Sequence, residues 1–435
     1  MSWEMKHSGI EWIGEIPKEW KVMPFKQMYE LGKGLSITKA DLVEEGIPVI
    51  SYGQIHSKAN TGTTIKDELI RFVPDEFLDD NASSLVKKGD VVFADTSEDI
   101  EGCGNCVYID RDIIIFAGYH TIIAKYLSSK PNNYLSYLFK TDCWRSQIRS
   151  SVNGVKLFSV PQRLLGRTTI ILPPLSEQLK IADYLDKVCG EVDEMIALQE
   201  QMIEELKAYK QSVITEAVTK GLNPNVLMKD SGIDWIGEIP KHWSLHQFRR
   251  IFEIKKIIAG TLGYDVLSVT QNGIKVKDLT KNEGQIAQDY SKYQLVDVDD
   301  YVMNHMDLLT GYVDCSKQEG VTSPDYRVFR AINKSQISLS YYLRLFQTCY
   351  KEKIFYHLGQ GVSGMGRWRL PAEQLKLFYL PMPPLSEQHS ISFYLDTKCA
   401  EIDVLIALKQ NKIDELKEYK KSVIYEYVTG KKEVI

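Results

Sequence analysis

The sequence predicts a mixed α/β fold: two copies of one globular module, joined by two long helices that form a coiled-coil spacer. Three observations support this fold class. Residues 8–20 return at 231–243 with eleven of thirteen positions identical, and a Pro-Pro-Leu-Ser-Glu-Gln motif at 173–178 returns at 383–388. A long segment without proline follows each copy of the second motif. Because internal repeats reflect repeated architecture, the chain is expected to have an internal pseudo-twofold axis.

The composition is that of a globular protein and excludes several other classes. Of 435 residues, 44% are hydrophobic and 26% are charged, which argues against collagenous, low-complexity and largely disordered chains. Seven cysteines, an odd number, do not make a disulfide scaffold in a chain of this length. The sequence has no run of 18 apolar residues, and its first residues lack the apolar core of a signal peptide. We therefore expect a soluble protein of a reducing compartment.

Each Pro-Pro-Leu-Ser motif is expected to open a helix of about 43 residues, roughly 65 Å long at 1.5 Å per residue. Gly221 and Gly430 are the expected helix stops. Both helices carry apolar residues at successive steps of 7, 4, 7, 3 and 7, close to heptad spacing. The predicted coiled-coil positions are Leu185, Val192, Ile196, Ile203, Leu206 and Val213 in the first helix, and Leu395, Ile402, Ile406, Ile413, Leu416 and Val423 in the second. A lone helix cannot bury such a stripe, so each helix is the simplest partner of the other.

The repeat divides the chain into four segments. These are target-binding modules at 1–175 and 222–385, and spacer helices at 176–221 and 386–435. The segments that flank each interior, which we call the frame, repeat closely: residues 8–20 and 173–220 return at 231–243 and 383–430. The interiors at 21–150 and 244–360 share only short, scattered similarities. Such divergence suggests two modules that are built alike but face different targets; neutral drift after duplication is the alternative. Strand-like runs at 91–93, 113–116 and 168–172, with helical patterns at 134–149 and 340–356, predict mixed α/β interiors.

The formal net charge of −5 is an average over segments of opposite sign. Residues 111–175 hold nine basic and two acidic residues, and so do residues 326–385, whereas residues 1–110 hold eleven basic and twenty acidic residues. A basic region in each module suits a surface that follows DNA phosphates, although a solvated or protein-contacting face explains the charge equally well. The candidate DNA-binding residues are Lys140, Arg145, Arg149, Lys156, Arg163, Arg167, Arg344, Lys351, Lys353, Arg367 and Arg369. A glycine-rich segment at 359–366 precedes the last two, and we interpret it as a loop.

The sequence offers no recognisable catalytic or metal site. It lacks the G-x-x-x-x-G-K-[ST] phosphate loop and the Asn/Asp-Pro-Pro-Tyr/Phe motif of amino-methyltransferases. Cys103 and Cys106 form a C-x-x-C pair, but no second pair or suitably spaced histidine accompanies it. His242 and His246 have helical spacing, yet the first copy of the repeat has Glu19 in place of His242. We therefore predict no catalytic residue, no metal and no cofactor in this chain.

The two repeated motifs, Trp-Ile-Gly-Glu-Ile-Pro-x-x-Trp and Pro-Pro-Leu-Ser-Glu-Gln, resemble those of the DNA specificity (S) subunit of Type I restriction–modification systems. The order of module, helix, module, helix also resembles that family and covers essentially the whole chain. The resemblance implies a non-catalytic subunit in the prokaryotic cytoplasm. In that family each variable module reads one half of a split double-stranded DNA site, and the two long helices pack antiparallel between them.

The resemblance also implies partners. Two methyltransferase (M) subunits would supply S-adenosylmethionine and adenine-N6 methylation, and two restriction (R) subunits would supply ATP- and Mg-dependent translocation and cleavage. If the modules sit at opposite ends of a ~65 Å spacer, their half-sites lie at most about 19 base pairs apart. Because the interiors differ, the site is expected to be bipartite and asymmetric. A coiled-coil scaffold that organises proteins without binding DNA is the alternative, and a self-contained modification enzyme is disfavoured by the missing motifs.

Overall fold

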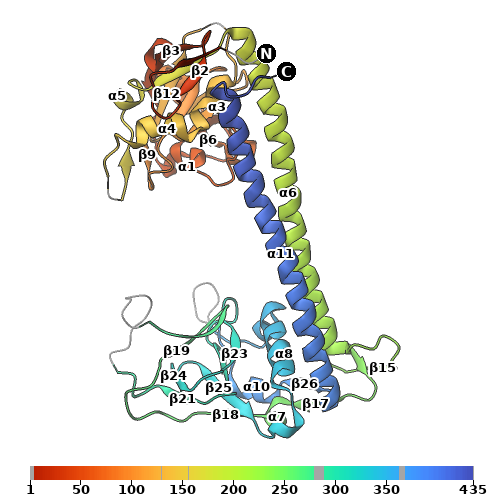
Figure 1. The fold of residues 1–435 in the computed structure, drawn as a ribbon. Coiled ribbons are helices and arrows are strands. Elements are labelled where there is room, and N and C mark those ends of the chain that lie inside the picture. The colour runs from red at the N-terminus through yellow and green to blue at the C-terminus, as the bar shows by residue number, and fades with distance from the viewer. Residues whose placement is uncertain (1–3, 129, 155, 279–288, 362–367, 435) are drawn as a thin grey trace. The chain divides into compact units, whose positions relative to one another are not determined.

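The computed structural model describes residues 4–128, 130–154, 156–278, 289–361 and 368–434. It divides into two compact units: unit 1 comprises Met1–Gln199 with Asn411–Ile435, and unit 2 comprises Glu200–Gln410. Each unit contains one module and the adjoining parts of the two long helices, α6 (Leu175–Lys220) and α11 (Leu385–Val428) (Figure 1). The sequence-based division follows the helix ends, whereas the contacts divide the chain within both helices, because each helix packs into both units.

Unit 1 is built from short strands and short helices. Its described strands are β1 (Met5–His7), β2 (Glu15–Pro17), β3 (Lys21–Pro24), β4 (Tyr29–Lys33), β5 (Ile47–Ile50), β6 (Arg71–Val73), β7 (Leu85–Val86), β8 (Val91–Ala94), β9 (Thr96–Ser97), β10 (Cys106–Tyr108), β11 (Ile115–Ala117), β12 (Thr121–Tyr126), β13 (Phe158–Ser159) and β14 (Thr169–Leu172). Its described short helices are α1 (Tyr52–Ile55), α2 (Phe77–Asp80), α3 (Tyr134–Lys140), α4 (Asp142–Arg149) and α5 (Gln162–Leu165). An antiparallel sheet of order β10-β8-β12-β4 forms the centre, and a second sheet of order β6-β5-β11-β7 lies beside it.

Unit 2 repeats the central sheet and replaces the second one. Its described strands are β15 (Met228–Asp230), β16 (Glu238–Pro240), β17 (Ser244–Gln247), β18 (Phe252–Lys255), β19 (Leu267–Thr270), β20 (Gly273–Val276), β21 (Gln294–Val296), β22 (Tyr301–Met303), β23 (Val313–Cys315), β24 (Gly320–Thr322), β25 (Arg327–Ala331) and β26 (Tyr379–Met382). Its described short helices are α7 (Phe248–Ile251), α8 (Leu339–Lys351), α9 (Ile354–His357) and α10 (Ala372–Leu377). The antiparallel order β18-β25-β22-β23 matches β4-β12-β8-β10 of unit 1, so β8 and β22 occupy equivalent places.

The mixed α/β content predicted for the modules is confirmed, with local differences. The run at 91–93 forms β8, whose four residues are all buried. The run at 113–116 forms a strand only from Ile115, because Ile113 and Ile114 are exposed. The predicted helix at 134–149 is interrupted at Thr141, whose side chain accepts a hydrogen bond from the backbone N–H of Trp144 and thereby caps α4.

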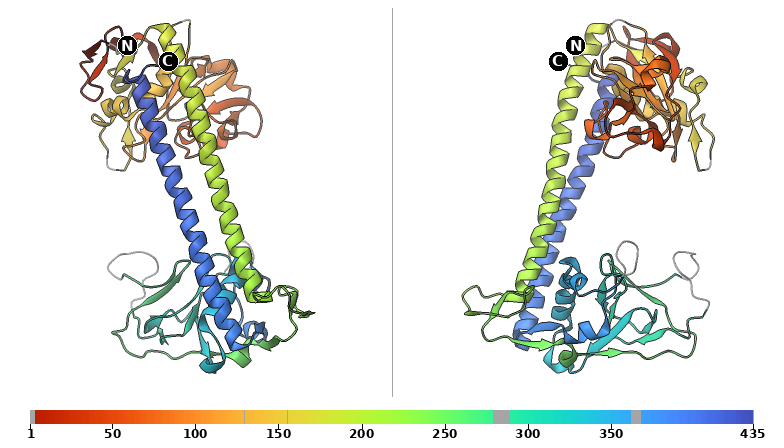
Figure 2. Two further views of the ribbon diagram at one scale, coloured as in Figure 1. Left: turned by 45° about the vertical axis from the view of Figure 1, so that its right-hand side comes forward. Right: turned by 180° about the vertical axis from the view of Figure 1, so that it is seen from behind.

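The two long helices pack together and run antiparallel. In unit 1, Asp193 of α6 pairs with Lys420 of α11, and in unit 2, Lys210 of α6 pairs with Asp403 of α11. Residue numbers rise along one helix as they fall along the other, so the helices run in opposite directions, and Figure 2 shows them side by side in both views. Left-handed glycines follow both helices, since Gly221 has φ +77° and Gly430 has φ +68°, as the predicted stops require.

The ends of the long helices close the core of each module. In unit 1, Leu185 from the start of α6 and Val428 from the end of α11 are both fully buried in the module's hydrophobic core. Tyr134 of α3 donates a hydrogen bond to the backbone oxygen of Val428 at 2.9 Å. In unit 2, Tyr341 of α8 donates to the oxygen of Val218 at 2.8 Å, the same contact with the helices exchanged. Each module is therefore fixed to the start of one helix and the end of the other.

Candidate nucleic-acid interface

The two repeated sequence motifs contact each other in both modules. The indole N–H of Trp20 donates to the Glu177 carboxylate at 3.1 Å, and that of Trp243 donates to Glu387 at 2.9 Å. Both tryptophan side chains are fully buried beneath the starts of the long helices. Burial raises the pKa of Glu177, while the Trp20 hydrogen bond opposes that rise. The repeated residues thus form a clamp that fixes each module to a helix start, which explains why the two frames share their sequence.

A glutamine completes each clamp. Gln178 donates to the backbone oxygen of Pro173 at 2.8 Å, and Gln388 donates to that of Pro383 at 2.9 Å. Both glutamines are buried, and their amide groups satisfy carbonyls that would otherwise be left unpaired at the helix start. This contact accounts for the Glu-Gln pair at the end of the Pro-Pro-Leu-Ser-Glu-Gln motif.

The ion pairs between the long helices follow the internal repeat. The repeat offset of 210 residues, read from the second motif, carries Asp193 onto Asp403 and Lys210 onto Lys420. In unit 1 Lys420 contacts Asp193 at 2.7 Å, and in unit 2 Lys210 contacts Asp403. The same two positions therefore meet twice, with the helices exchanged, as expected of an isologous contact about a twofold axis.

The predicted coiled-coil residues all lie on protected faces of α6 and α11. Eight are buried: Leu185, Val192, Ile203, Leu395, Ile402, Ile413, Leu416 and Val423. Four are partly buried: Ile196, Leu206, Val213 and Ile406. Leu185, Leu395 and Val423 belong to the module cores, so the end positions pack against the modules as well as against the other helix.

Three of the basic candidates of unit 1 are exposed. Lys156 lies two residues before β13, Arg163 lies on α5, and Arg167 lies between α5 and β14. Strand β13 pairs with β9 in the register Phe158–Ser97 and Ser159–Thr96, so Lys156 lies beyond the Ser97 end of this pairing, on the side away from β8. These three side chains are free to reach phosphates.

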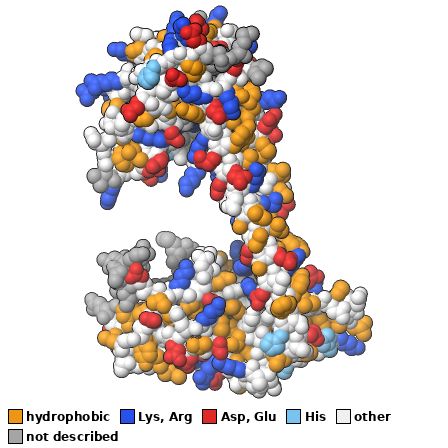
Figure 3. Space-filling model, viewed as in Figure 1, with side chains coloured by type: hydrophobic (Ala, Val, Ile, Leu, Met, Phe, Trp, Pro, Cys, Tyr) orange, Lys and Arg blue, Asp and Glu red, His pale blue; other side chains and the backbone are white. Residues whose placement is uncertain are grey.

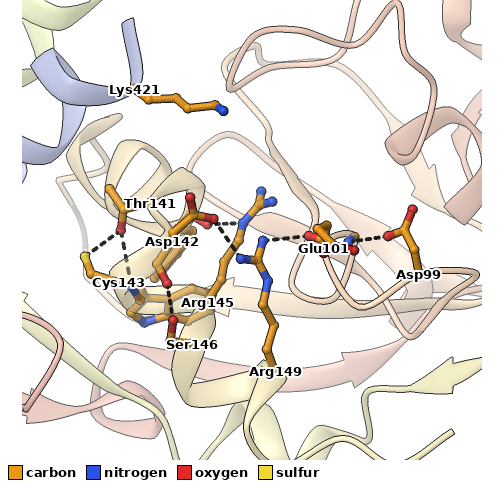
Figure 4. Close-up of polar contacts among 12 residues, drawn as sticks. Asp99, Glu101, Thr141, Asp142, Cys143, Arg145, Ser146, Arg149 and Lys421 are labelled. Atoms are coloured by element: carbon orange, nitrogen blue, oxygen red, sulfur yellow. Dashed lines mark hydrogen bonds and ion pairs between the residues drawn. The ribbon is translucent and has the colours of Figure 1, made fainter. Parts of the chain in front are cut away.

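Of the other three basic candidates of unit 1, Arg145 and Arg149 bond to the protein itself (Figure 4), and Lys140 is partly buried. Arg145 is only 8% exposed, and its Nε donates to the backbone oxygen of Phe139 at 2.9 Å. Arg149 bonds the Asp142 carboxylate and the backbone oxygen of Glu101, both at 2.7 Å. Burial lowers the pKa of Lys140 to about 8, with Arg145 and Lys420 lowering it further.

These contacts argue against Arg145 as a DNA-binding residue. A buried guanidinium that is bonded to its own backbone cannot reach a phosphate without opening α3 and α4. This burial could not be predicted, because a basic residue in an amphipathic helix is exposed or buried according to the face that packs. We therefore remove Arg145 from the candidate interface and assign Arg149 mainly to holding the 97–102 loop against α4.

In unit 2 the basic candidates divide in the same way. Lys351, Lys353 and Arg369 are exposed. Arg344 contacts Asp396 of α11 at 3.1 Å and so connects the module to the helix. Arg367, with most of the predicted glycine-rich loop, lies outside the described residues. The backbones of Gln360, before those residues, and Arg369, after them, exchange hydrogen bonds, which fixes the backbone position of Arg369.

Within each unit, the face seen in Figure 3 shows Lys and Arg side chains interspersed with Asp and Glu. Neither unit presents a uniform basic patch on that face. Phosphate contacts there would therefore come from single basic side chains rather than from one broad field.

Sequence reasoning missed a polar cluster at the end of β8 in unit 1. Asp95 follows β8, and its carboxylate contacts the Nδ1 atom of His120 at 2.9 Å. The rings of Tyr52 and Tyr119 lie against the His120 imidazole, with centroids 5.5 and 4.0 Å away. These residues are far apart in sequence and come partly from the most acidic segment, so a search for basic runs could not find them.

The described residues include no group of three or more His, Cys, Asp or Glu arranged to hold a metal ion. Cys103 and Cys106 are both buried in the apolar core of unit 1, and burial raises the pKa of both thiols. Among the helices that the structure describes, none is long and apolar enough to cross a membrane.

The fold and the clamps define a class of protein: a duplicated α/β module carried on an antiparallel helical pair, with divergent surfaces on a repeated frame. The chain matches the family model for the Type I restriction modification DNA specificity domain over residues 17–208 and 253–418, one match for each half. These two segments cover most of the chain, and the chain therefore belongs to that family.

Relatives and solved structures agree with this assignment. The chain is 24% identical over 425 residues to a protein named the MjaX type I restriction enzyme specificity subunit of Methanocaldococcus jannaschii, covering 96% of this chain and 95% of the relative. It is 24% identical over 311 residues to the EcoBI specificity subunit of Escherichia coli, covering 66% and 63% of the two chains. The fold resembles a chain from a solved structure on assembly and conformational transition of the type I R-M system, with a TM-score of 0.67 at 16% identity, covering 95% and 98%. It also resembles the HsdS subunit of Thermoanaerobacter tengcongensis, with a TM-score of 0.50, 16% identity and the same coverage.

Proposed function

We propose that this chain is the sequence-specificity subunit of a Type I restriction–modification complex and reads a bipartite, asymmetric site in double-stranded DNA. The observation that carries the proposal is the duplicated specificity domain, in which identical clamps hold modules with different surfaces. A repeated frame with different reading surfaces suits two half-sites of different sequence. We place the protein in the cytoplasm of a prokaryotic cell, where its DNA lies.

The proposal assigns catalysis to partners. Two M subunits would bind S-adenosylmethionine and methylate adenine N6, and two R subunits would use ATP and Mg for translocation and cleavage. The pseudo-twofold exchange of contacts between α6 and α11 supports symmetric placement of two M subunits, because each half of the helical pair offers a partner the same positions. The chain itself would bind DNA and organise the assembly without catalysing a reaction.

The test uses the full chain co-expressed with its M partner. The methylome of cells that express the complex identifies the split site, and binding to a duplex of that sequence is then measured over a range of salt concentrations. The proposal predicts tight binding to that duplex, about 10³-fold or more tighter than to a scrambled duplex. Binding of proteins without binding of DNA would favour the scaffold alternative.

A matched pair of variants examines the phosphate contacts. Arg163→Ala removes an exposed cation and should weaken binding to specific and scrambled duplexes alike, with a shallower dependence on salt. Arg145→Met removes the buried cation and should not change the salt dependence, because this guanidinium contacts its own backbone. Equal salt slopes for the Arg163 variant and the unchanged chain would remove Arg163 from the interface.

A further inference from the structure

The backbone of unit 1 fixes Asp95 and His120 directly opposite each other. Thr121 pairs with Ala94 at the end of the β8–β12 ladder, and the next residues, Asp95 and His120, continue it through an N–H···O bond of 3.1 Å. The oxygen of Asp95 also accepts a hydrogen bond from the backbone of Val160 at 2.7 Å. Both side chains are about a third exposed, so the pair is held rigidly and yet open to solvent.

His120 occupies a left-handed backbone conformation, with φ +53°. This conformation is unfavourable for a bulky residue and persists only where neighbouring contacts impose it. Here the preceding residue imposes it: the Tyr119 N–H donates to Ser51 Oγ, and its oxygen accepts from the Tyr52 N–H, both at 3.1 Å. A glycine or an asparagine would adopt this backbone conformation at a lower energetic cost than histidine does. The backbone conformation alone therefore does not explain why a histidine stands at this position.

Aromatic groups surround the pair on one side. The Tyr119 side chain is 45% exposed, and Tyr52 packs edge-on against His120. His56, at the end of α1, has both ring nitrogens occupied, with Nε2 at 2.8 Å from the Thr96 oxygen and Nδ1 at 3.0 Å from the Asn105 amide nitrogen. His56 is therefore a positioning residue that links α1 to β9, which lie at the same edge of unit 1 in Figure 1.

The pair presents hydrogen-bond acceptors to its surroundings. Because the Asp95 carboxylate can only accept, the His120 Nδ1 atom carries the proton of their contact, and the Nε2 atom of the neutral ring is left as an acceptor. The second carboxylate oxygen of Asp95 is also an acceptor. In the major groove, the exocyclic amino groups of cytosine N4 and adenine N6 are donors, whereas guanine O6 and thymine O4 are acceptors.

We propose that Asp95 and His120 read the exocyclic amino group of a cytosine or adenine in the half-site bound by unit 1. This inference rests on the proposed function, because it requires that the module binds DNA. Lys156 lies four residues before Val160, the residue whose backbone bonds Asp95, and would contact a phosphate at some distance from the pair. A keto base at the same position would face two acceptors and be rejected.

Unit 2 has different chemistry at the equivalent position. The matched registers of β8 with β12 and of β22 with β25 place His305 where unit 1 has Asp95. The Nδ1 atom of His305 is buried without a hydrogen-bond partner among the described residues, and the positive charges of Arg327 and Arg369 act on its ring. The proposed reading pair therefore acts at one half-site only.

The test uses the full chain in complex with its M subunit. The probes are duplexes of the methylome-derived site in which each position of one half-site is replaced in turn by the other three bases. The unchanged complex is expected to prefer cytosine or adenine to the keto bases by about 10-fold or more at one position. Asp95→Asn replaces one of the two acceptor oxygens with an amide N–H donor and should reduce or reverse that preference, with the preferences at all positions of the other half-site unchanged.

His120→Gly is the second variant, because glycine adopts the left-handed backbone freely and removes only the imidazole. It should reduce discrimination at the same position or at the adjacent one. Lys156→Ala is the control, and it should weaken binding to all duplexes by a similar factor.

Two outcomes would overturn the proposal. Unchanged base preferences in both variants would exclude the pair from reading, and so would a uniform loss of affinity like that of Lys156→Ala. If instead the unchanged complex showed no sequence preference at all, the proposed function itself would fail, and the reading pair with it.

Discussion

The two modules carry different residues at the end of the same strand. In unit 1 this position holds Asp95, which pairs with His120. In unit 2 it holds His305, whose pKa is lowered to about 4 by burial and by the positive charges of Arg327 and Arg369. One module thus presents acceptors at this point, and the other surrounds a neutral imidazole with cations. The shared sheet positions the surface, and the residue at the end of the strand determines what that surface can bind.

The clamps, in contrast, have the same residues and the same contact in both modules. Trp20 with Glu177 and Trp243 with Glu387 make the same hydrogen bond at the two helix starts. The two halves therefore share the residues that fix each module to α6 and α11 and differ in the residue that follows the equivalent strands β8 and β22.

The two clamps should contribute similar amounts to the free energy of unfolding of their units. Trp20→Ala and Trp243→Ala each remove a fully buried indole and its hydrogen bond, and each should lower the free energy of unfolding of its own unit by about 4 kcal/mol. Hydrogen exchange of peptides from each unit measures the effect separately. Trp12→Ala, at a residue 43% exposed, is the control and should cost far less. A Trp20 variant as stable as the Trp12 variant would refute the clamp.

A buried ion pair is expected to stabilise unit 2 and has no equivalent among the described residues of unit 1. In unit 2, Lys255 contacts Asp300 at 2.7 Å with both side chains buried, whereas the strand register places Gly32 at the Lys255 position of unit 1. Asp300→Ala should destabilise unit 2 by about 3 kcal/mol, because it leaves a buried ammonium that the exposed Asp297 compensates only in part.

The double variant Lys255→Met with Asp300→Ala leaves no lone buried charge and should regain part of the loss. Denaturant unfolding followed by hydrogen exchange of unit 2 measures both variants. A double variant less stable than Asp300→Ala alone would show that Lys255 stabilises the unit by something other than this pair.

Acid should destabilise unit 2 through His305. Its pKa in the folded protein, about 4, lies below its usual value near 6.5, so the folded unit binds the proton less tightly than the unfolded chain does. The contribution of His305 to the free energy of unfolding is fully present above pH 6.5 and is lost as the pH falls toward 4. After a discount for partial exposure, the loss is about 1–2 kcal/mol.

His305→Phe should flatten this pH dependence, as measured by hydrogen exchange of unit 2 at pH 7 and at pH 5. Unit 1 serves as the internal reference, because it has Asp95 at the equivalent place. An unchanged pH dependence in the variant would assign the acid sensitivity to another group.

The exchanged ion pairs should have small and similar effects. Lys210→Ala and Lys420→Ala each remove one pair between α6 and α11, and each should cost about 0.5 kcal/mol, with the larger loss at the less exposed Lys420. The double exchange Lys210→Asp with Asp403→Lys should restore most of the loss, as measured by thermal unfolding. A double exchange that is no better than Lys210→Ala would show that the pair is not coupled.

Much of the frame could be predicted from the sequence. Helix lengths follow from the proline motifs and the apolar period, and the stops at Gly221 and Gly430 follow from the need for a left-handed residue after a helix. The order of strands could not be predicted, because β4, β8 and β12 pair across long intervals and their runs are too short to show their partners.

The candidate site was harder to predict than the frame. Counting charge by segment found the exposed Lys156 and Arg163, but it also selected Arg145, whose burial depends on how α4 packs. It could not find Asp95 and His120, because only the antiparallel pairing of β8 with β12 brings together residues 25 positions apart. Contacts between residues that are distant in the sequence therefore require the fold, whereas the frame follows largely from the repeats.

Exchange of one module interior would show whether the two modules read their half-sites independently. Residues 21–150 are replaced by the corresponding interior of another member of the family, and the methylome of cells expressing the hybrid with its M partner is compared with that of the unchanged complex. The account predicts a new sequence in one half-site, with the other half-site and the spacing between them unchanged. A change in both half-sites would contradict the independent reading of two half-sites by two modules on one repeated frame.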